Sequence, residues 1–229
     1  MKNGIGTLMA LAFILVIIAF PASARKQYLD MDGETTHDGL YRVKRSIMDQ
    51  AWARADIDLG DYDKLMLVSA GLQYRPVKSR SRSEFPVTEE QKERLQELIR
   101  EVFTDAFSDL DRFTLVDTPG PGVLILHAGI IDIVSNVPPE RMGRGNIYLS
   151  SSGEATLVLE LRDAPSNAVL VRVADRRSAE QRGIAMPSSP VTNTSNVRNA
   201  VRQWARIIRR ALDRIVVVDA EGNITSEKP

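Results

Sequence analysis

The segment Thr156-Leu-Val-Leu-Glu-Leu-Arg162 continues through Asp163-Ala-Pro-Ser-Asn167 into Val169-Leu-Val-Arg-Val173. Leucines and valines recur at every second position of both arms, and charged side chains occupy several positions between them. A period of two is the spacing of a strand with one buried face, and Pro, Ser and Asn are typical turn residues. The segment therefore predicts a β-hairpin with one face in the core and the other partly in water.

Three further stretches predict strands. Residues 65–74 are largely apolar and end at Arg75-Pro76, and residues 113–116 form a short apolar run. Residues 123–134 are rich in β-branched side chains, with apolar residues at odd and even positions. Such a pattern is typical of a central strand that is covered on both faces over part of its length.

The clearest helix is predicted to begin after Thr88. Gln91 stands three residues later, which is the spacing of a capping box, and Glu89 and Glu90 occupy the first turn, where the helix dipole favours negative charge. Apolar residues then recur every three or four positions as far as Leu110. This periodicity indicates one buried helical face.

A second amphipathic helix is expected to begin at Asn193 or Thr194 and to end near Ile215. Its apolar residues form a helical stripe, and the positions around the stripe are rich in arginine. The arginines of this segment are Arg198, Arg202, Arg206, Arg209, Arg210 and Arg214, and its only acid is Asp213.

The order of these elements predicts an α+β fold: a two-layer sandwich in which an antiparallel or mixed sheet carries two amphipathic helices on one face. We expect one such domain over residues 62–219, an extended or irregular lead-in over residues 25–61 with at most one short helix, and a loose tail over residues 220–229. Residues 176–190 are expected to form a polar loop. An open sheet edge at the Phe113 or Leu157 strand would favour self-association.

Residues 1–24 have the pattern of an export signal. A positive start is followed by an apolar run from Leu8 to Phe20 and by Pro21-Ala-Ser-Ala24 at the expected cleavage point. The run is shorter than the roughly 20 residues of a spanning helix, so cleavage after Ala24 is favoured over an uncleaved N-terminal anchor. We expect an exported protein in the periplasm or associated with the cell envelope.

Composition excludes several classes of chemistry. The chain has 30 basic and 30 acidic residues, so it carries no net charge that would mark a nucleic-acid-binding protein. It has no cysteine, which excludes disulfides, thiolate metal sites, cysteine nucleophiles and acylation of a lipoprotein cysteine. Phosphate-loop, nucleophile-elbow and zinc-helix motifs are absent from the sequence. We predict no cofactor and no metal.

The arginine-rich helix is the strongest local charge feature, and its candidate surface consists of Arg198, Arg202, Arg206, Arg209 and Arg210. In an exported protein it favours docking to anionic lipid headgroups, lipopolysaccharide, peptidoglycan or an acidic envelope protein. The alternative is a solvated face whose arginines pair with acids from neighbouring loops. Nucleic acid is disfavoured, because export removes the protein from the cytoplasm. The sequence leaves the oligomeric state open.

A second hypothesis is a periplasmic hydrolase with a carboxylate-centred site. It rests on Asp63, Asp117 and Asp132, which lie beside predicted strand ends, where active-site residues are often carried. His127 stands five positions before Asp132, so the two side chains would face opposite sides of a regular strand unless a bulge intervenes. Overall, the sequence favours a binding or assembly module over an enzyme.

The segments Asp38-Gly-Leu-Tyr41, Asp61-Tyr-Asp-Lys-Leu-Met-Leu67 and Pro119-Gly-Pro-Gly-Val-Leu-Ile-Leu126, together with Ile131-Asp132, resemble bacterial envelope proteins of the domain-of-unknown-function 3313 (DUF3313) family. The resemblance extends over residues 38–215 and implies an exported protein. Many members look like lipoproteins, from which this chain departs because it has no cysteine to acylate. The order of elements is also similar to that of the curli secretion pore subunit, an analogy of fold. The family implies no activity and no catalytic residue.

Overall fold

A computed structural model describes residues 29–78, 81, 83–138, 147–180, 186–213, 217–218 and 224–225. The predicted signal segment, Arg214 and most of residues 220–229 lie outside these ranges. The elements, in chain order, are β1 (Tyr41–Arg42), β2 (Gln50–Ala53), β3 (Lys64–Tyr74), α2 (Glu89–Phe107), β4 (Thr114–Leu115), β5 (Val123–Ser135), β6 (Tyr148–Leu149), β7 (Gly153–Asp163), β8 (Val169–Ser178), β9 (Met186–Pro187), α3 (Pro190–Asp213), β10 (Val217–Val218) and β11 (Ile224–Thr225).

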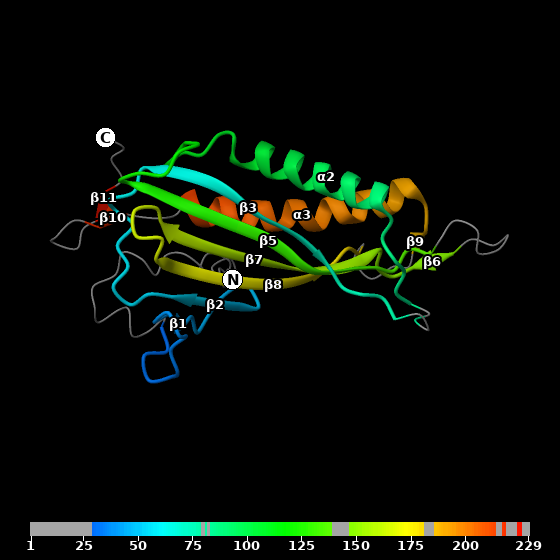
Figure 1. The fold of residues 1–229 in the computed structure, drawn as a ribbon, viewed down its shortest axis with the longest axis horizontal. Helices are drawn as coiled ribbons and strands as arrows, with labels where there is room; N and C mark the ends of the chain where they lie inside the picture. The colour runs from blue at the N-terminus through cyan, green and yellow to red at the C-terminus, as the bar shows by residue number, and fades with distance from the viewer. Residues whose placement is uncertain are drawn as a thin grey trace, which may run out of the picture.

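Seven strands form one mixed sheet in the order β1-β2-β8-β7-β5-β3-β4. β3 is parallel to β4 and to β5, whereas the remaining neighbours are antiparallel. Helices α2 and α3 pack side by side on one face of this sheet (Figure 1). The predicted α+β sandwich with two helices on one face is thus confirmed.

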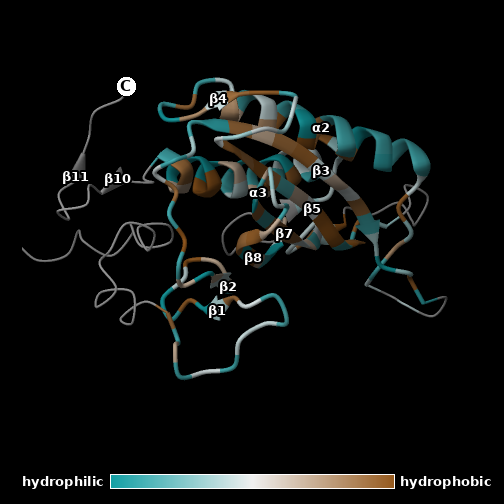
Figure 2. Ribbon diagram, turned by 60° about the vertical axis from the view of Figure 1, so that its left-hand side comes forward, coloured by the Kyte–Doolittle hydropathy of each residue, from teal (hydrophilic) through white to brown (hydrophobic). Residues whose placement is uncertain are grey.

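The core lies between the helices and the sheet. Leu65, Leu124 and Leu157 of three neighbouring strands are fully buried, and Trp204 and Leu212 of α3 are nearly so. The strands β3 and β5 are strongly hydrophobic and the outer side of α2 is hydrophilic (Figure 2). The face of the sheet away from the helices is called the open face below.

A buried carboxylate joins α3 to strand β8 of the sheet. Asp175 of β8 accepts a hydrogen bond from Nε1 of Trp204 at 2.8 Å and one from the backbone N–H of Asp49 at 3.1 Å. Nε of Arg177 donates to it at 2.6 Å. A buried charge is tolerated where it is paired and hydrogen-bonded, so these contacts fix the place of α3 over β8.

The lead-in supplies two strands of the main sheet. The described residues 29–61 contain no helix; instead they contribute β1 and β2, and β2 pairs with β8 in the main sheet. Ala51 and Ala53 are buried, while Gln50 is exposed, so the segment does alternate with a period of two. The alternation was hard to see in the sequence, because alanine contributes little to a hydrophobic pattern.

The second helix begins earlier than Asn193. α3 starts at Pro190, after Ser189, whose hydroxyl accepts a hydrogen bond from the backbone N–H of Thr192 at 3.1 Å. Proline is well suited to the first helical position, because its missing N–H would have no helical partner there. The expected polar loop over residues 176–190 is shortened further, because β8 continues to Ser178 and β9 follows.

A bulge interrupts β5 near its end. The register with β7 shifts between Ile131 and Val134, and Asp132 has a positive φ of 56°. Aspartate is one of the few residues that adopt this left-handed conformation readily. The bulge turns the Asp132 carboxylate towards Arg176 of β8, which lies on the open face.

Candidate functional site

Two groups of ion pairs occupy the open face. The first, the mid-sheet cluster, consists of Asp38, Glu160, Arg162 and Arg172. The strand register places Arg172 directly opposite Glu160, and its Nε donates to that carboxylate at 2.7 Å. Nη2 of Arg172 also reaches Asp38, in the loop before β1, at 2.7 Å. Arg172 therefore connects this loop to the middle of the sheet.

The surroundings of Asp38 stabilise its charged form. Burial would raise the pKa of this carboxyl, but hydrogen bonds from the hydroxyl of Thr36 at 2.6 Å and from Arg172 outweigh that effect. The pKa of Asp38 falls to about 2. Burial likewise opposes the effect of Arg172 and Arg162 on Glu160, whose pKa is lowered on balance. Both carboxylates are charged at neutral pH.

The second group, the sheet-end cluster, consists of Arg75, Glu84, Asp132, Glu154 and Arg176. Arg75 donates two hydrogen bonds to the Asp132 carboxylate, at 2.6 and 2.5 Å, and one to Glu84 at 3.0 Å. Arg176 donates to Asp132 at 2.7 Å and to Glu154 at 2.5 Å. The cluster joins the ends of β3, β5, β7 and β8.

Asp132 is the centre of that cluster. The hydrogen bonds from Arg75 lower its pKa most, burial opposes them, and Arg176 lowers it further, to about 2. The same contacts raise the pKa of Arg75. Both arginines are thus committed to carboxylates of the same chain, which indicates a structural role for the cluster.

The three candidate carboxylates of the hydrolase hypothesis are not brought together. Asp63 immediately precedes β3, and Asp117 is an exposed residue just after β4, so these two lie at the same end of the sheet. Asp132 lies near the other end, where β5 pairs with the last residues of β3. At a rise of about 3.3 Å per residue, the ten or so positions between them correspond to roughly 30 Å. Acid–base pairs work at hydrogen-bond distance, so these residues do not form one site.

Two of the α3 arginines are paired. Arg198 contacts Glu101 of α2 through both of its terminal nitrogens, at 2.6 and 3.0 Å. Arg209 donates to the backbone carbonyls of Ala106, at 3.0 Å, and Asp109, which satisfies the C-terminal end of α2. These two side chains hold the two helices together.

Three other arginines form an exposed row. Arg202, Arg206 and Arg210 are spaced four residues apart on the outer face of α3, and this row is called the arginine stripe. Among the described residues no carboxylate lies within 4.0 Å of any of them, and the one hydrogen bond that their side chains donate runs from Nε of Arg206 to the carbonyl of Arg202 at 3.2 Å. At 1.5 Å per helical residue the stripe is about 12 Å long.

The sequence does not reveal which arginines of the sheet are paired. Glu160 and Arg172 occupy charged positions of the predicted hairpin, but their pairing depends on a register that the turn sets. The partnership of Arg75 with Asp132 depends on the bulge in β5, for which the sequence offers no clear signal. A charged helix can be recognised from a local pattern, whereas ion pairs between strands join residues that are distant in sequence.

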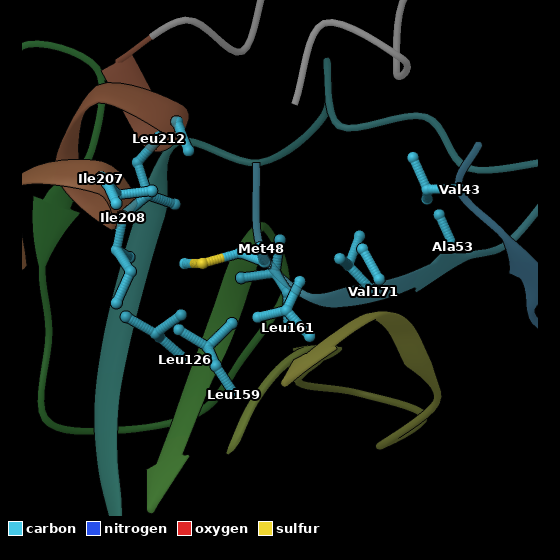
Figure 3. A pocket seen from close by; sticks show the side chains of 13 residues that line it. Val43, Met48, Ala53, Leu126, Leu159, Leu161, Val171, Ile207, Ile208 and Leu212 are labelled. Atoms are coloured by element: carbon cyan, nitrogen blue, oxygen red, sulfur yellow. The ribbon is translucent and has the colours of Figure 1, made fainter. Parts of the chain in front are cut away.

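A small cavity lies between the sheet and the C-terminal half of α3 (Figure 3). Its volume is about 40 Å³, and apolar side chains line it throughout, among them Met48, Leu126, Leu161, Ile208 and Leu212. A ligand pocket needs several polar groups that fix the orientation of the ligand, and this lining supplies none. The cavity is therefore a feature of core packing.

Within the described ranges no group of three or more histidines and acids is arranged to hold a metal ion. The same ranges contain no helix with both the length and the apolar character that crossing a membrane requires.

The family model of a protein of unknown function (DUF3313) matches residues 38–208. The chain therefore belongs to the DUF3313 family, in agreement with the resemblance seen in its sequence. No curated protein matches it.

Several solved structures are similar to parts of this chain at low sequence identity. The PelC dodecamer from Paraburkholderia phytofirmans is 11% identical, with a TM-score of 0.33 over 67% of this chain and 89% of that chain. A protein of Xanthomonas campestris assigned to family DUF330 is 10% identical, with a TM-score of 0.36 over 66% and 83%. A minor lipoprotein from Acinetobacter baumannii is 13% identical, with a TM-score of 0.31 over 66% and 93%.

Proposed function

We propose that this member of the DUF3313 family is an exported, non-enzymatic module of the cell envelope that docks to anionic phospholipid headgroups through its arginine stripe. The export signal predicted in residues 1–24 supports the location. The observation that carries the docking surface is that Arg202, Arg206 and Arg210 are exposed and aligned, and that no described carboxylate lies within 4.0 Å of them.

The geometry of α3 suits a flat anionic surface. Its inner side is buried through Val201, Trp204 and Ile208, so the helix lies along the sheet with the stripe turned outward. Guanidinium groups present several donors at once to phosphate oxygens, and each cation near an anionic membrane contributes about 1 kcal/mol. Three arginines therefore contribute about 3 kcal/mol, which corresponds to roughly a hundredfold in affinity.

The experiment measures co-sedimentation with vesicles of phosphatidylethanolamine and phosphatidylglycerol, using phosphatidylcholine vesicles as the uncharged reference. The protein is expressed from its full-length sequence, and the form that results after any processing by the cell is purified. Replacing the three stripe arginines with glutamate should lower the partition coefficient by about a hundredfold or more. Binding of the unchanged protein should also weaken with added salt, because exposed charges are screened.

A charge-matched control distinguishes the stripe from net charge. Arg42, Arg45 and Lys78 are exposed and have no carboxylate within 4.0 Å among the described residues, and they belong to β1, the turn after it and the segment after β3 rather than to α3. Replacing these three with glutamate changes the net charge by the same amount, and it should leave vesicle binding largely intact. Equal losses in the two triple variants would contradict docking through the stripe, as would unaltered binding after the stripe is reversed.

A further inference from the structure

The edge strand β3 is open along most of its length. It pairs with β5 throughout, but on its other side only Lys64 and Leu65 pair with the two-residue strand β4. Ser69 is exposed at this edge, and so is the side chain of Leu67, which retains 40% of its accessible surface. The described part of the chain therefore leaves the edge uncovered beyond Leu65.

Backbone groups point outward from this edge. The carbonyls of Asp63 and Leu65 accept hydrogen bonds from Thr114, at 2.9 Å, and Val116, at 3.0 Å, so the odd-numbered residues face away from β5. By the alternation of a strand, the N–H and C=O groups of Leu67 and Ser69 face the same way. They have no backbone partner among the described residues.

The edge also lacks the usual protection against pairing. Natural edge strands often carry prolines, lysines or other charged residues that block pairing, but residues 65–74 contain no charged residue and no proline. A bulge at Ala70 and Gly71 ends the regular stretch but leaves the preceding residues in strand geometry. At the opposite edge, β1 is two residues long, and Val43 donates to the carbonyl of Ala51 at 2.8 Å, which covers β2 further.

We infer that this open edge pairs antiparallel with the same edge of a second copy of the chain, about a two-fold axis at Val68. In that register Leu67 of each copy exchanges both backbone hydrogen bonds with Ser69 of the other. The pairing brings no like charges together, because residues 65–74 carry no charge. A strand that pairs with itself about a two-fold axis is also self-complementary. Leu67 and the exposed Leu115 supply apolar surface beside it.

The arrangement has a consequence for docking that rests on the proposed function. Residues directly opposite one another in an antiparallel pair face the same side, so both helix layers lie on one side of the joined sheet. The two arginine stripes would then face the same membrane, and binding through both would be stronger than through either alone. Pairing itself is measured without lipid, so a failure of docking leaves it standing and the reverse also holds.

The first test exploits the absence of cysteine from the sequence. Val68→Cys places a thiol at the two-fold axis, in a non-hydrogen-bonded pair with a Cα separation of about 4.5 Å, within the range of disulfides. Under mild oxidation it should yield a disulfide-linked dimer on non-reducing gels. Ser69→Cys, one residue away, should not, because its Cα atoms would lie beyond about 7 Å. Absence of the Val68→Cys dimer, or equal cross-linking of both variants, would overturn the register.

The second test measures mass against concentration by sedimentation equilibrium. The unchanged protein should shift from monomer to dimer, and Leu67→Lys and Ser69→Pro should remain monomeric with unaltered circular dichroism. Ile47→Lys is the matched control, because Ile47 is 43% exposed but lies away from β3. It should dimerise normally. A protein that stays monomeric at every concentration, or a dimer that survives both edge substitutions, would refute the inference.

Discussion

Arginines serve different purposes on the open face of the sheet and on the outer face of α3. On the sheet, Arg172 contacts two carboxylates and Arg75 contacts three. On the helix, the stripe arginines have no carboxylate partner within 4.0 Å among the described residues. The difference shows that positive charge alone does not mark a docking surface, because paired arginines are already occupied within the fold.

The two groups of arginines also differ in how readily they are noticed in the sequence. Six arginines in one helix are conspicuous because they are near neighbours, whereas those of the sheet are scattered over residues 75–176. The described members of the helix group are themselves mixed: Arg198 and Arg209 join α3 to α2, whereas the three stripe arginines have no described carboxylate within 4.0 Å. Folding stability should therefore depend on the paired arginines, and membrane binding on the arginine stripe.

The largest difference in folding stability is expected for charge reversal. Arg172→Glu would place a third carboxylate between Glu160 and Asp38, both partly buried, and should lower the free energy of unfolding by about 2 kcal/mol. Arg206→Glu should change it by less than about 0.5 kcal/mol. Urea unfolding followed by the fluorescence of Trp52 and Trp204 measures both. Equal destabilisation by the two reversals would remove the distinction between sheet and stripe.

A smaller difference is expected when side chains are only truncated. Arg75→Ala removes two hydrogen bonds to Asp132 and should lower the free energy of unfolding by about 1 kcal/mol, since the cluster is partly exposed to solvent. Arg210→Ala serves as the control and should leave the free energy of unfolding unchanged within error. If Arg75→Ala is also neutral, the sheet-end cluster does not contribute to stability.

The sheet-end cluster should also show in the response to acid. The pKa of Asp132 lies at about 2, below its ordinary value of 3.8, so its contribution to stability is fully present above pH 4 or so and is lost as the pH falls towards 2. Asp132→Asn should flatten the fall of the unfolding free energy over that interval. Stability measured by urea unfolding at a series of pH values checks this. An unchanged acid response would mean that Asp132 does not carry the dependence.

The smallest effect on stability concerns the helix cap. The hydroxyl of Thr88 accepts a hydrogen bond from the backbone N–H of Gln91, and the Gln91 side chain accepts one from the N–H of Thr88. Thr88→Ala should cost about 1 kcal/mol or less, because the cap is exposed. Vesicle binding should not change, since α2 lacks the stripe. A loss of binding would connect α2 to the docking surface.

Much of the fold could be predicted because its signals are local. The hairpin of β7 and β8, the cap of α2 and the apolar stripe of α3 each depend on residues close in sequence, and the structure confirms them. The position of a strand within the sheet is not a local property. The Leu157 strand is central as β7, paired with β5 and β8, whereas the Phe113 strand does lie at the edge, as β4.

The features that the sequence does not reveal depend on distant contacts. Whether an arginine of α3 is free or paired is decided by Glu101 and by the end of α2, about a hundred residues away. β2 becomes a strand because β8 offers it an edge, and not through strong β propensity of its own alanines. The candidate surface was therefore predicted as a helix face, and only tertiary structure reduces it to the stripe.

One measurement tests the central claim most directly, and it uses the absence of cysteine in the chain. Gln203→Cys places a thiol on the exposed face of α3 beside the stripe without removing an arginine, and Ile131→Cys places one on the open face. Each is labelled with a polarity-sensitive fluorophore and mixed with phosphatidylglycerol-containing vesicles. We predict a blue shift for the label at Gln203 and none for the label at Ile131. A shift at Ile131 alone, or the same shift at both positions, would contradict docking through the stripe.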